Sequence, residues 1–148
     1  MILTPHLLLG AAIASKIPNI YLAAFLSFTS HYLLDLIPHV EYSVENIKNK
    51  RWHRALPDFT KVFIDFSFSV LLILLLSDGQ LNILIIALFS IVPDGFELLR
   101  LFFSNKLSDT RNNMHQKVHF LKDKKISNFW RVLSQILIVV ISIFLLRV

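Results

Sequence analysis

The chain has 148 residues, of which 55% are hydrophobic, and it contains thirteen Phe, three Gly and no Cys. This apolar share predicts one integral-membrane domain over residues 1–148, and the absence of Cys excludes disulfides, thiolate metal sites and a cysteine nucleophile. The formal net charge is +5, but the Lys and Arg residues cluster in two loops beside apolar stretches, so we expect anionic lipid rather than nucleic acid as their partner.

Five apolar stretches, taken in chain order, predict an all-α polytopic membrane protein with four or five membrane-embedded helices. The first, Leu7 to Ser15, is short, and we expect it to pair with the second. A spanning helix needs about 20 mainly apolar residues. The other four stretches approach that length: Ile20 to Pro38, Phe59 to Ser77, Leu81 to Phe103 and Phe129 to Leu146.

Small residues, together with ionisable ones, lie along one face of each of the first two predicted helices. His6, Gly10 and Ala14 recur every four residues, a spacing that permits close helix packing in lipid. The second helix has the same spacing on one face, with Ala23, Ser27, His31 and Asp35. We therefore expect these two faces to meet.

The loops predict the topology. Four Lys and Arg residues lie between Glu41 and Pro57, six lie between Ser104 and Ser127, and the turn at Asp78-Gly79 has none. If the helices flanking that turn form a hairpin across the bilayer, the positive-inside rule places both basic loops in the cytoplasm. Within the second basic loop, a helical spacing of apolar residues predicts a short interfacial helix around Met114, Val118 and Leu121.

Ionisable side chains interrupt the predicted spans near this cytoplasmic end. A charged group at the bilayer centre costs at least about 3 kcal/mol on insertion scales, so such residues usually face the bundle interior and mark function. The residues concerned are His31, Asp35, His39, Asp65, Asp94 and Glu97.

The pattern His31-x-x-x-Asp35 places an imidazole and a carboxylate one turn apart on the same helical face. At this spacing two side chains can bind one metal ion, and His39 adds another imidazole just after the helix. A structural His–Asp pair that helps helices pack is the alternative interpretation. Pro93-Asp94-Gly95 predicts a helix break beside a cavity, for which a packing kink is the alternative.

Two further pairs of residues have the same four-residue spacing. His115 and His119 form a common arrangement of metal ligands, although solvated histidines have the same pattern. Lys61 and Asp65 are expected beside the site, either as groups that support its ligands or as a simple intrahelical ion pair.

Taken together, these motifs resemble the small bacterial inner-membrane proteins called membrane-bound metal-dependent hydrolases, which are distantly similar to zinc-dependent phospholipases C. The matching motifs are Thr4-Pro5-His6 with Gly10, Ser30-His31-x-x-x-Asp35-x-x-Pro38-His39, Pro93-Asp94-x-x-Glu97, and His115-x-x-x-His119. The resemblance implies two or three divalent ions, zinc or else manganese or iron, that act on a phosphate ester. By position, the family-like ligands are His6, His31, Asp35, Asp94 and His115. His39 and His119 complete the expected set.

The sequence thus predicts an inner-membrane hydrolase of a phosphoester, with lipid as environment and substrate. One of the carboxylates Asp35, Asp94 and Glu97 would act as general base. Three basic residues would attract the anionic headgroup: Lys117, Lys122 and Arg131. A metal or proton transporter is the main alternative, since intramembrane Asp and His also form ion relays, and a non-catalytic scaffold is the third.

Overall fold

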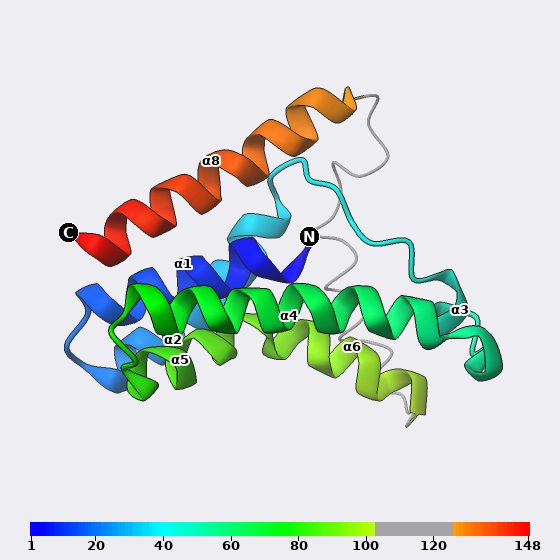
Figure 1. Cartoon of the computed structure of the whole chain (residues 1–148), viewed down its shortest axis with the longest axis horizontal. Coiled ribbons are helices and arrows are strands. Elements are labelled where there is room, and N and C mark those ends of the chain that lie inside the picture. Colours follow the sequence, from blue (N-terminus) through cyan, green and yellow to red (C-terminus); the bar gives the residue numbers. More distant parts are fainter. Residues whose placement is uncertain (103–125) are drawn as a thin grey trace.

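The computed structural model describes residues 1–102 and 126–148, and every regular element in these ranges is helical (Figure 1). The all-α prediction is therefore confirmed for the described chain, whereas the expected interfacial helix near Met114 lies outside it. The elements are α1 (Leu3–Lys16), α2 (Ile20–Asp35), α3 (Glu45–Lys48), the 3₁₀ turn η1 (Trp52–Arg54), α4 (Leu56–Leu76), α5 (Leu81–Leu88), the 3₁₀ turn η2 (Phe89–Ile91), α6 (Val92–Phe102) and α8 (Asn128–Arg147).

Three helical stretches are long and apolar enough to cross a membrane: Leu56–Leu76, Leu81–Arg100 and Asn128–Arg147. This number is lower than the four or five helices predicted from the sequence. The difference arises at α2, which has only 16 residues and ends at Asp35 rather than at Pro38. A residue that precedes proline is disfavoured in the α conformation, so the helix stops before Ile37.

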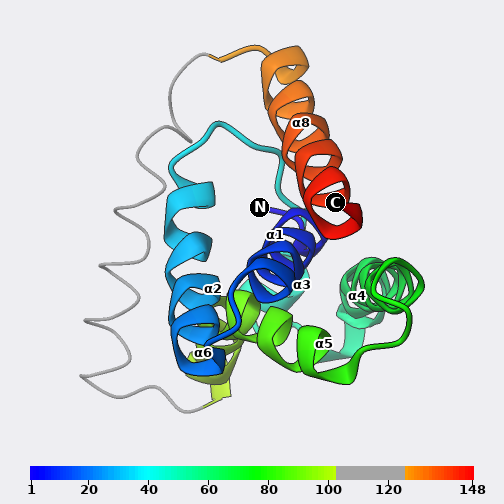
Figure 2. The ribbon, with the colours of Figure 1, turned by 90° about the vertical axis from the view of Figure 1, so that its left-hand side faces the viewer.

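Helix α1 lies at the centre of the molecule and contacts α2, α4, α5 and α8 (Figure 2). Leu7, Leu8 and Ala11 are fully buried there. The prediction that the short first helix pairs with the second is confirmed. Because four helices surround it, α1 can carry polar side chains that lipid never contacts.

The contact between α1 and its neighbours depends on Gly10. A Cβ atom at this position would lie 2.6 Å from Ser27 Oγ and 3.1 Å from Ala87 Cα. The Ser27 hydroxyl in turn donates a hydrogen bond to the Ile86 carbonyl at 3.0 Å. The two small-residue faces predicted from the sequence therefore meet, and α5 joins them.

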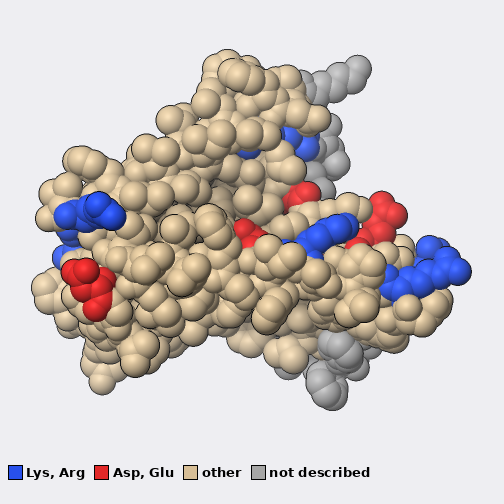
Figure 3. Space-filling view, in the orientation of Figure 1, with Lys and Arg blue, Asp and Glu red and all other residues tan. Residues whose placement is uncertain are grey.

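The outer surface is largely apolar. Large side chains on the candidate spans point outward, among them Phe63, Leu75 and Phe144, each about two-thirds exposed (67%, 66% and 65%). Figure 3 shows a broad uncharged surface, with charged residues at its left end and in its right half. Such a surface is consistent with a membrane protein.

Candidate metal centre

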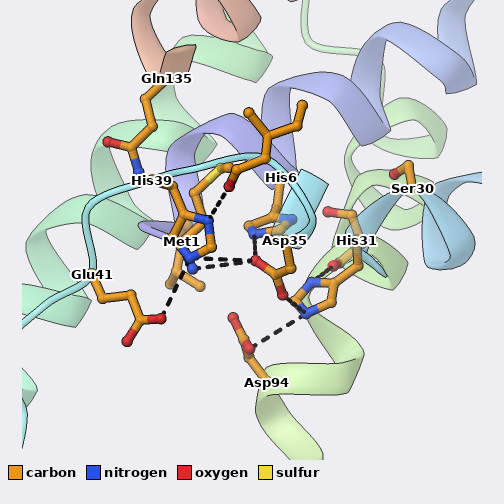
Figure 4. Close-up of polar contacts among 12 residues, drawn as sticks. Met1, His6, Ser30, His31, Asp35, His39, Glu41, Asp94 and Gln135 are labelled. Carbon is orange, nitrogen blue, oxygen red and sulfur yellow. Dashed lines mark hydrogen bonds and ion pairs between the residues drawn. The ribbon is translucent and has the colours of Figure 1, made fainter. Parts of the chain in front are cut away.

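Three buried side chains from two helices form the core of the site. His6 comes from α1, and His31 and Asp35 come from α2 (Figure 4). Each offers one ligand atom, and these atoms all lie within 4.8 Å of one another. The group could hold a metal ion, as the sequence predicted.

The fold positions these three residues in two ways. His31 and Asp35 lie one turn apart on α2, so their side chains point the same way. Helix α1 then approaches α2 closely enough for the rings of His6 and His31 to stack, with centroids 4.3 Å apart. His6 Nε2 lies 3.4 Å from Asp35 Oδ1.

The hydrogen bonds of His31 identify its tautomer. Its Nδ1 lies 2.7 Å from the Ser90 carbonyl oxygen, and because a carbonyl only accepts, Nδ1 carries the proton. The other nitrogen, Nε2, lies 3.0 Å from Asp35 Oδ2. In the neutral ring Nε2 carries a lone pair, which faces the negative charge of Asp35. A cation between Nε2 and Oδ2, either a metal ion or a proton, would stabilise this contact.

His39, in the segment between α2 and α3, is oriented in the same way as His31. Its Nδ1 donates to the Ile37 carbonyl at 2.7 Å, which leaves Nε2 to face the site. Nε2 lies 3.9 Å from Asp35 Oδ1 and 3.4 Å from Glu41 Oε1. The structure thus adds Glu41, which was not predicted from the sequence. The only signal in the sequence was its position two residues after His39, which shares a face with His39 if the chain is extended.

Asp94 reaches the same group from α6. Its Oδ1 lies 3.5 Å from His31 Nε2, and its side chain is 31% exposed, so it lies between the buried ligands and the surface. The helix break predicted at Pro93-Asp94-Gly95 lies a few residues earlier, as the 3₁₀ turn η2, and these three residues belong to α6. The turn η2 carries the Ser90 carbonyl bound by His31. Glu97 is half-buried one turn further along α6.

Two separations match the ligand spacing of a bound zinc ion, whereas that from His31 Nε2 to Asp35 Oδ2 is shorter, at 3.0 Å. A zinc ion bound by nitrogen and oxygen ligands at 2.0–2.2 Å in tetrahedral geometry separates those ligands by about 3.3–3.6 Å. The pairs His6–Asp35 and His31–Asp94 lie at 3.4 and 3.5 Å. Asp35 also accepts a hydrogen bond from the Met1 amino group at 3.3 Å.

Asp65 supports the site from α4, a role that agrees with its predicted place beside the ligands. Its carboxylate accepts hydrogen bonds from the backbone N–H groups of Leu3 and Thr4, at 2.7 and 3.2 Å, and from the Thr4 hydroxyl. The Tyr42 hydroxyl also donates to it. Burial and this contact raise the pKa of Tyr42 above its ordinary value, so the phenol remains a donor. Asp65 thereby fixes the start of α1, three residues before His6.

Helix α8 holds the segment that carries His39. Ser134 Oγ donates to the Pro38 carbonyl at 2.5 Å, and Gln135 Nε2 donates to the Val40 carbonyl at 2.9 Å. Neither residue was predicted from the sequence, although a Gln within an apolar stretch is a visible signal. These bonds satisfy carbonyl groups on both sides of His39.

Of the remaining predicted residues, the structure describes two, Lys61 and Arg131. Lys61 is about half-exposed and contacts Asp58 and the Ser43 carbonyl, at 3.7 and 3.3 Å. Arg131 lies in the first turn of α8 and is partly exposed. Four residues fall outside the described ranges: His115, Lys117, His119 and Lys122.

Comparison with known proteins adds no identification. No family model matches the chain. No curated protein and no solved structure is similar enough to count as a match either. The residues and their geometry therefore carry the functional argument alone.

Proposed function

We propose that this protein is a membrane-embedded, metal-dependent hydrolase that cleaves a phosphoester, with a membrane lipid as substrate. The supporting observation is the pair of imidazoles, His31 and His39, whose Nδ1 protons are donated to backbone carbonyls. Both rings thereby turn Nε2 toward one buried carboxylate, Asp35. Histidines held in this way by a second partner are characteristic of metal ligands.

Each residue has a role in this proposal. His6, His31 and Asp35 hold a divalent ion, zinc in the first place, with manganese or iron as alternatives. When bound, the ion would lower the pKa of a water molecule and neutralise charge on phosphoryl oxygens. Asp94 lies nearest the surface and is best placed to accept the proton of the attacking water, with Glu97 next to it on α6.

The position of the site supports a lipid substrate. Asp94 precedes Arg100, the last residue of its candidate span, by six residues, or about 9 Å along a helix. This depth corresponds to headgroups and ester bonds rather than to the bilayer centre. Lys117, Lys122 and Arg131 are proposed to attract the anionic headgroup. The bacterial inner membrane, with both basic loops in the cytoplasm, completes the proposal.

A transporter is less well supported. A transport path would continue through the bilayer as a series of ionisable or hydrated groups. Within residues 1–102 and 126–148, however, the buried ionisable side chains all lie toward one end of the bundle: His6, His31, Asp35, His39 and Asp58. Toward the other end the buried polar side chains are hydroxyls, at Ser77 and Ser142.

Metal analysis and a lipid panel test the proposal together. Protein purified in detergent is expected to retain at least one equivalent of zinc, manganese or iron and to hydrolyse one class of phospholipid. Chelation should abolish this hydrolysis, and the same metal should restore it. Lys48→Ala, an exposed change far from the site, serves as a neutral control. Absence of hydrolysis with every divalent metal tested would refute the proposal.

A further inference from the structure

We propose that the segment between α3 and α4, residues 49–55, binds the headgroup of an anionic phospholipid through Lys50, Arg51 and Arg54. This inference goes beyond the proposed function and does not depend on it. The three residues are the only Lys and Arg in the segment, which contains no Asp or Glu. All three are exposed. No carboxylate within residues 1–102 and 126–148 forms an ion pair with any of them.

The segment lies directly before a candidate membrane span. Helix α4 begins at Leu56 and is long and apolar enough to cross a membrane. Trp52 is 41% exposed, and Trp side chains favour the level of the lipid headgroups. Figure 3 shows Lys and Arg side chains at the right-hand end of the molecule, where Figure 1 places α3 and the start of α4. The basic groups therefore lie where lipid phosphates are within reach.

The backbone of the segment is held in place by hydrogen bonds. The Lys50 N–H donates to the Ile47 carbonyl at 3.0 Å, and the Arg51 N–H donates to the Asn46 carbonyl at 2.8 Å. These bonds close the end of α3, and the 3₁₀ turn η1 follows at once. The buried carboxylate of Asp58 in α4 accepts hydrogen bonds from the N–H groups of Asn46 and Ile47, at 2.9 and 3.4 Å. Because the backbone is already ordered, less conformational entropy is lost when a headgroup binds.

Lys50 has a backbone conformation that its side chain disfavours. Its φ is +54°, in the left-handed region, where the Cβ of any residue other than glycine is crowded. Glycine is the usual residue at this position after a helix, since it closes the same hydrogen bonds without crowding. The exposed Lys50 side chain adds nothing to the core. Its presence in a strained turn therefore indicates a role outside the fold.

Charges that only set the topology of the chain are the competing explanation, because the positive-inside rule requires no binding site. The two explanations differ in which lipid lies beside the segment. Topology alone predicts anionic and zwitterionic lipids in proportion to their amounts in the bilayer. A binding site predicts that the anionic lipid is enriched there.

Trp52 can report on the lipid beside it. The chain has two Trp residues, and Trp130→Phe leaves Trp52 as the only one. In this background, the full chain is reconstituted into mixed bilayers of phosphatidylglycerol and phosphatidylcholine, with bromine on the acyl chains of one lipid or the other. The quenching of Trp52 fluorescence by each brominated lipid gives their relative binding constant. We expect the anionic lipid to be preferred by more than about fivefold, the contribution of one basic residue near an anionic surface.

Lys50→Gly should lower this preference about fivefold, because it removes one of the three cations. The same variant should have an unchanged or higher melting temperature, because glycine relieves the strain at this position. Lys16→Gln is the matched control. It removes an exposed charge at the end of α1, at the opposite end of the molecule from α3, and should leave the preference unchanged (Figure 1).

Three outcomes of the quenching measurement would overturn the inference: equal quenching by the two lipids, an unchanged preference in Lys50→Gly, or an equal loss in Lys16→Gln. A lower melting temperature in Lys50→Gly would assign its side chain to the fold and would also overturn it. None of these outcomes affects the proposed hydrolase, which is tested by metal content and hydrolysis.

Discussion

Asp65 and Thr4 join α4 to the first turn of α1 through two hydrogen bonds, one from the backbone N–H and one from the hydroxyl of Thr4. Asp65 thus caps a helix that begins 62 residues earlier, at Leu3. A carboxylate at a helix N-terminus also interacts favourably with the helix dipole. Because His6 lies in the second turn of this helix, Asp65 determines how α1 presents it to Asp35.

Asp65→Ala should therefore weaken metal binding as well as the fold. Loss of the carboxylate leaves buried N–H groups without an acceptor, at about 1–3 kcal/mol each, and loss of an outer partner of a metal ligand typically lowers metal affinity 10–100-fold. Asp65→Asn keeps an acceptor oxygen and should restore much of the affinity. Competition with a coloured chelator measures the change.

Asp58→Ala is the matched control for Asp65. Asp58 is also buried on α4, but its carboxylate accepts hydrogen bonds from Asn46 and Ile47 at the start of α3, away from the ligands. This variant should melt at a lower temperature with metal affinity unchanged. Equal losses of affinity in both variants would argue against a specific role for Asp65.

Asp94→Asn separates chemistry from architecture. The substitution keeps the size of the side chain and removes its charge beside His31. Hydrolysis should fall by at least about 100-fold, since general-base catalysis contributes 10²–10⁴-fold, and metal content should fall if Asp94 is also a ligand. The melting temperature of the apo protein should change little, because Asp94 is partly exposed. A large drop in stability with activity retained would show a structural Asp94 instead.

Gly10→Ala should destabilise the protein by about 1–3 kcal/mol through overpacking. The added methyl group would lie 2.6 Å from Ser27 Oγ and 3.1 Å from the Ala87 backbone. Gly95→Ala is the control, because a Cβ at Gly95 meets no heavy atom within 4 Å. Thermal unfolding in detergent should show a lower melting temperature for Gly10→Ala and an equal or higher one for Gly95→Ala. Similar melting curves would refute the close packing.

Gln135→Leu tests the support given by α8. The variant keeps an apolar helix surface but removes the donor to Val40, so the segment carrying His39 loses one of its two bonds to α8. Metal affinity should fall about tenfold, at the lower end of the range for outer-shell partners. Ser142→Ala, a buried change on the same helix, should leave the affinity unchanged. A reduced melting temperature at full affinity would assign Gln135 to the fold alone.

Single cysteines can test the topology, since the chain has none of its own. The positive-inside rule predicts that a cysteine at Asp78 is labelled from outside intact cells, whereas cysteines at Asn49 and Ser108 are protected. The reverse pattern would place the site on the opposite face of the membrane.

The sequence predicted the helices better than the segments between them. Long apolar stretches specify helices by composition, and the four-residue spacing of His31 and Asp35 identified two side chains that share a face. Pro93 indicated an interruption near Asp94, although the structure places it just before the proline, at Phe89–Ile91. The small residues around Gly10 indicated that α1 would approach α2.

The contributions of Glu41, Tyr42 and Gln135 were not predictable in the same way. They depend on the path of the non-helical chain between α2 and α3, and hydrophobic periodicity does not predict the path of such a segment. The end of α2 was misplaced for a related reason, because apolar residues continue past Asp35 while the backbone already departs from the helix before Pro38. Tertiary hydrogen bonds, rather than local patterns, determine this segment.

The central place of α1 has a consequence for biogenesis. This helix precedes all the others in the chain, yet its surroundings include α8, which is synthesised after them. During translation, His6 can meet His31 and Asp35 once α2 has emerged, whereas α8 holds the His39 segment only after it has been synthesised and docked. The arrangement of residues around His39 therefore becomes complete only late, with the docking of the last helix of the bundle rather than with the insertion of its first segments.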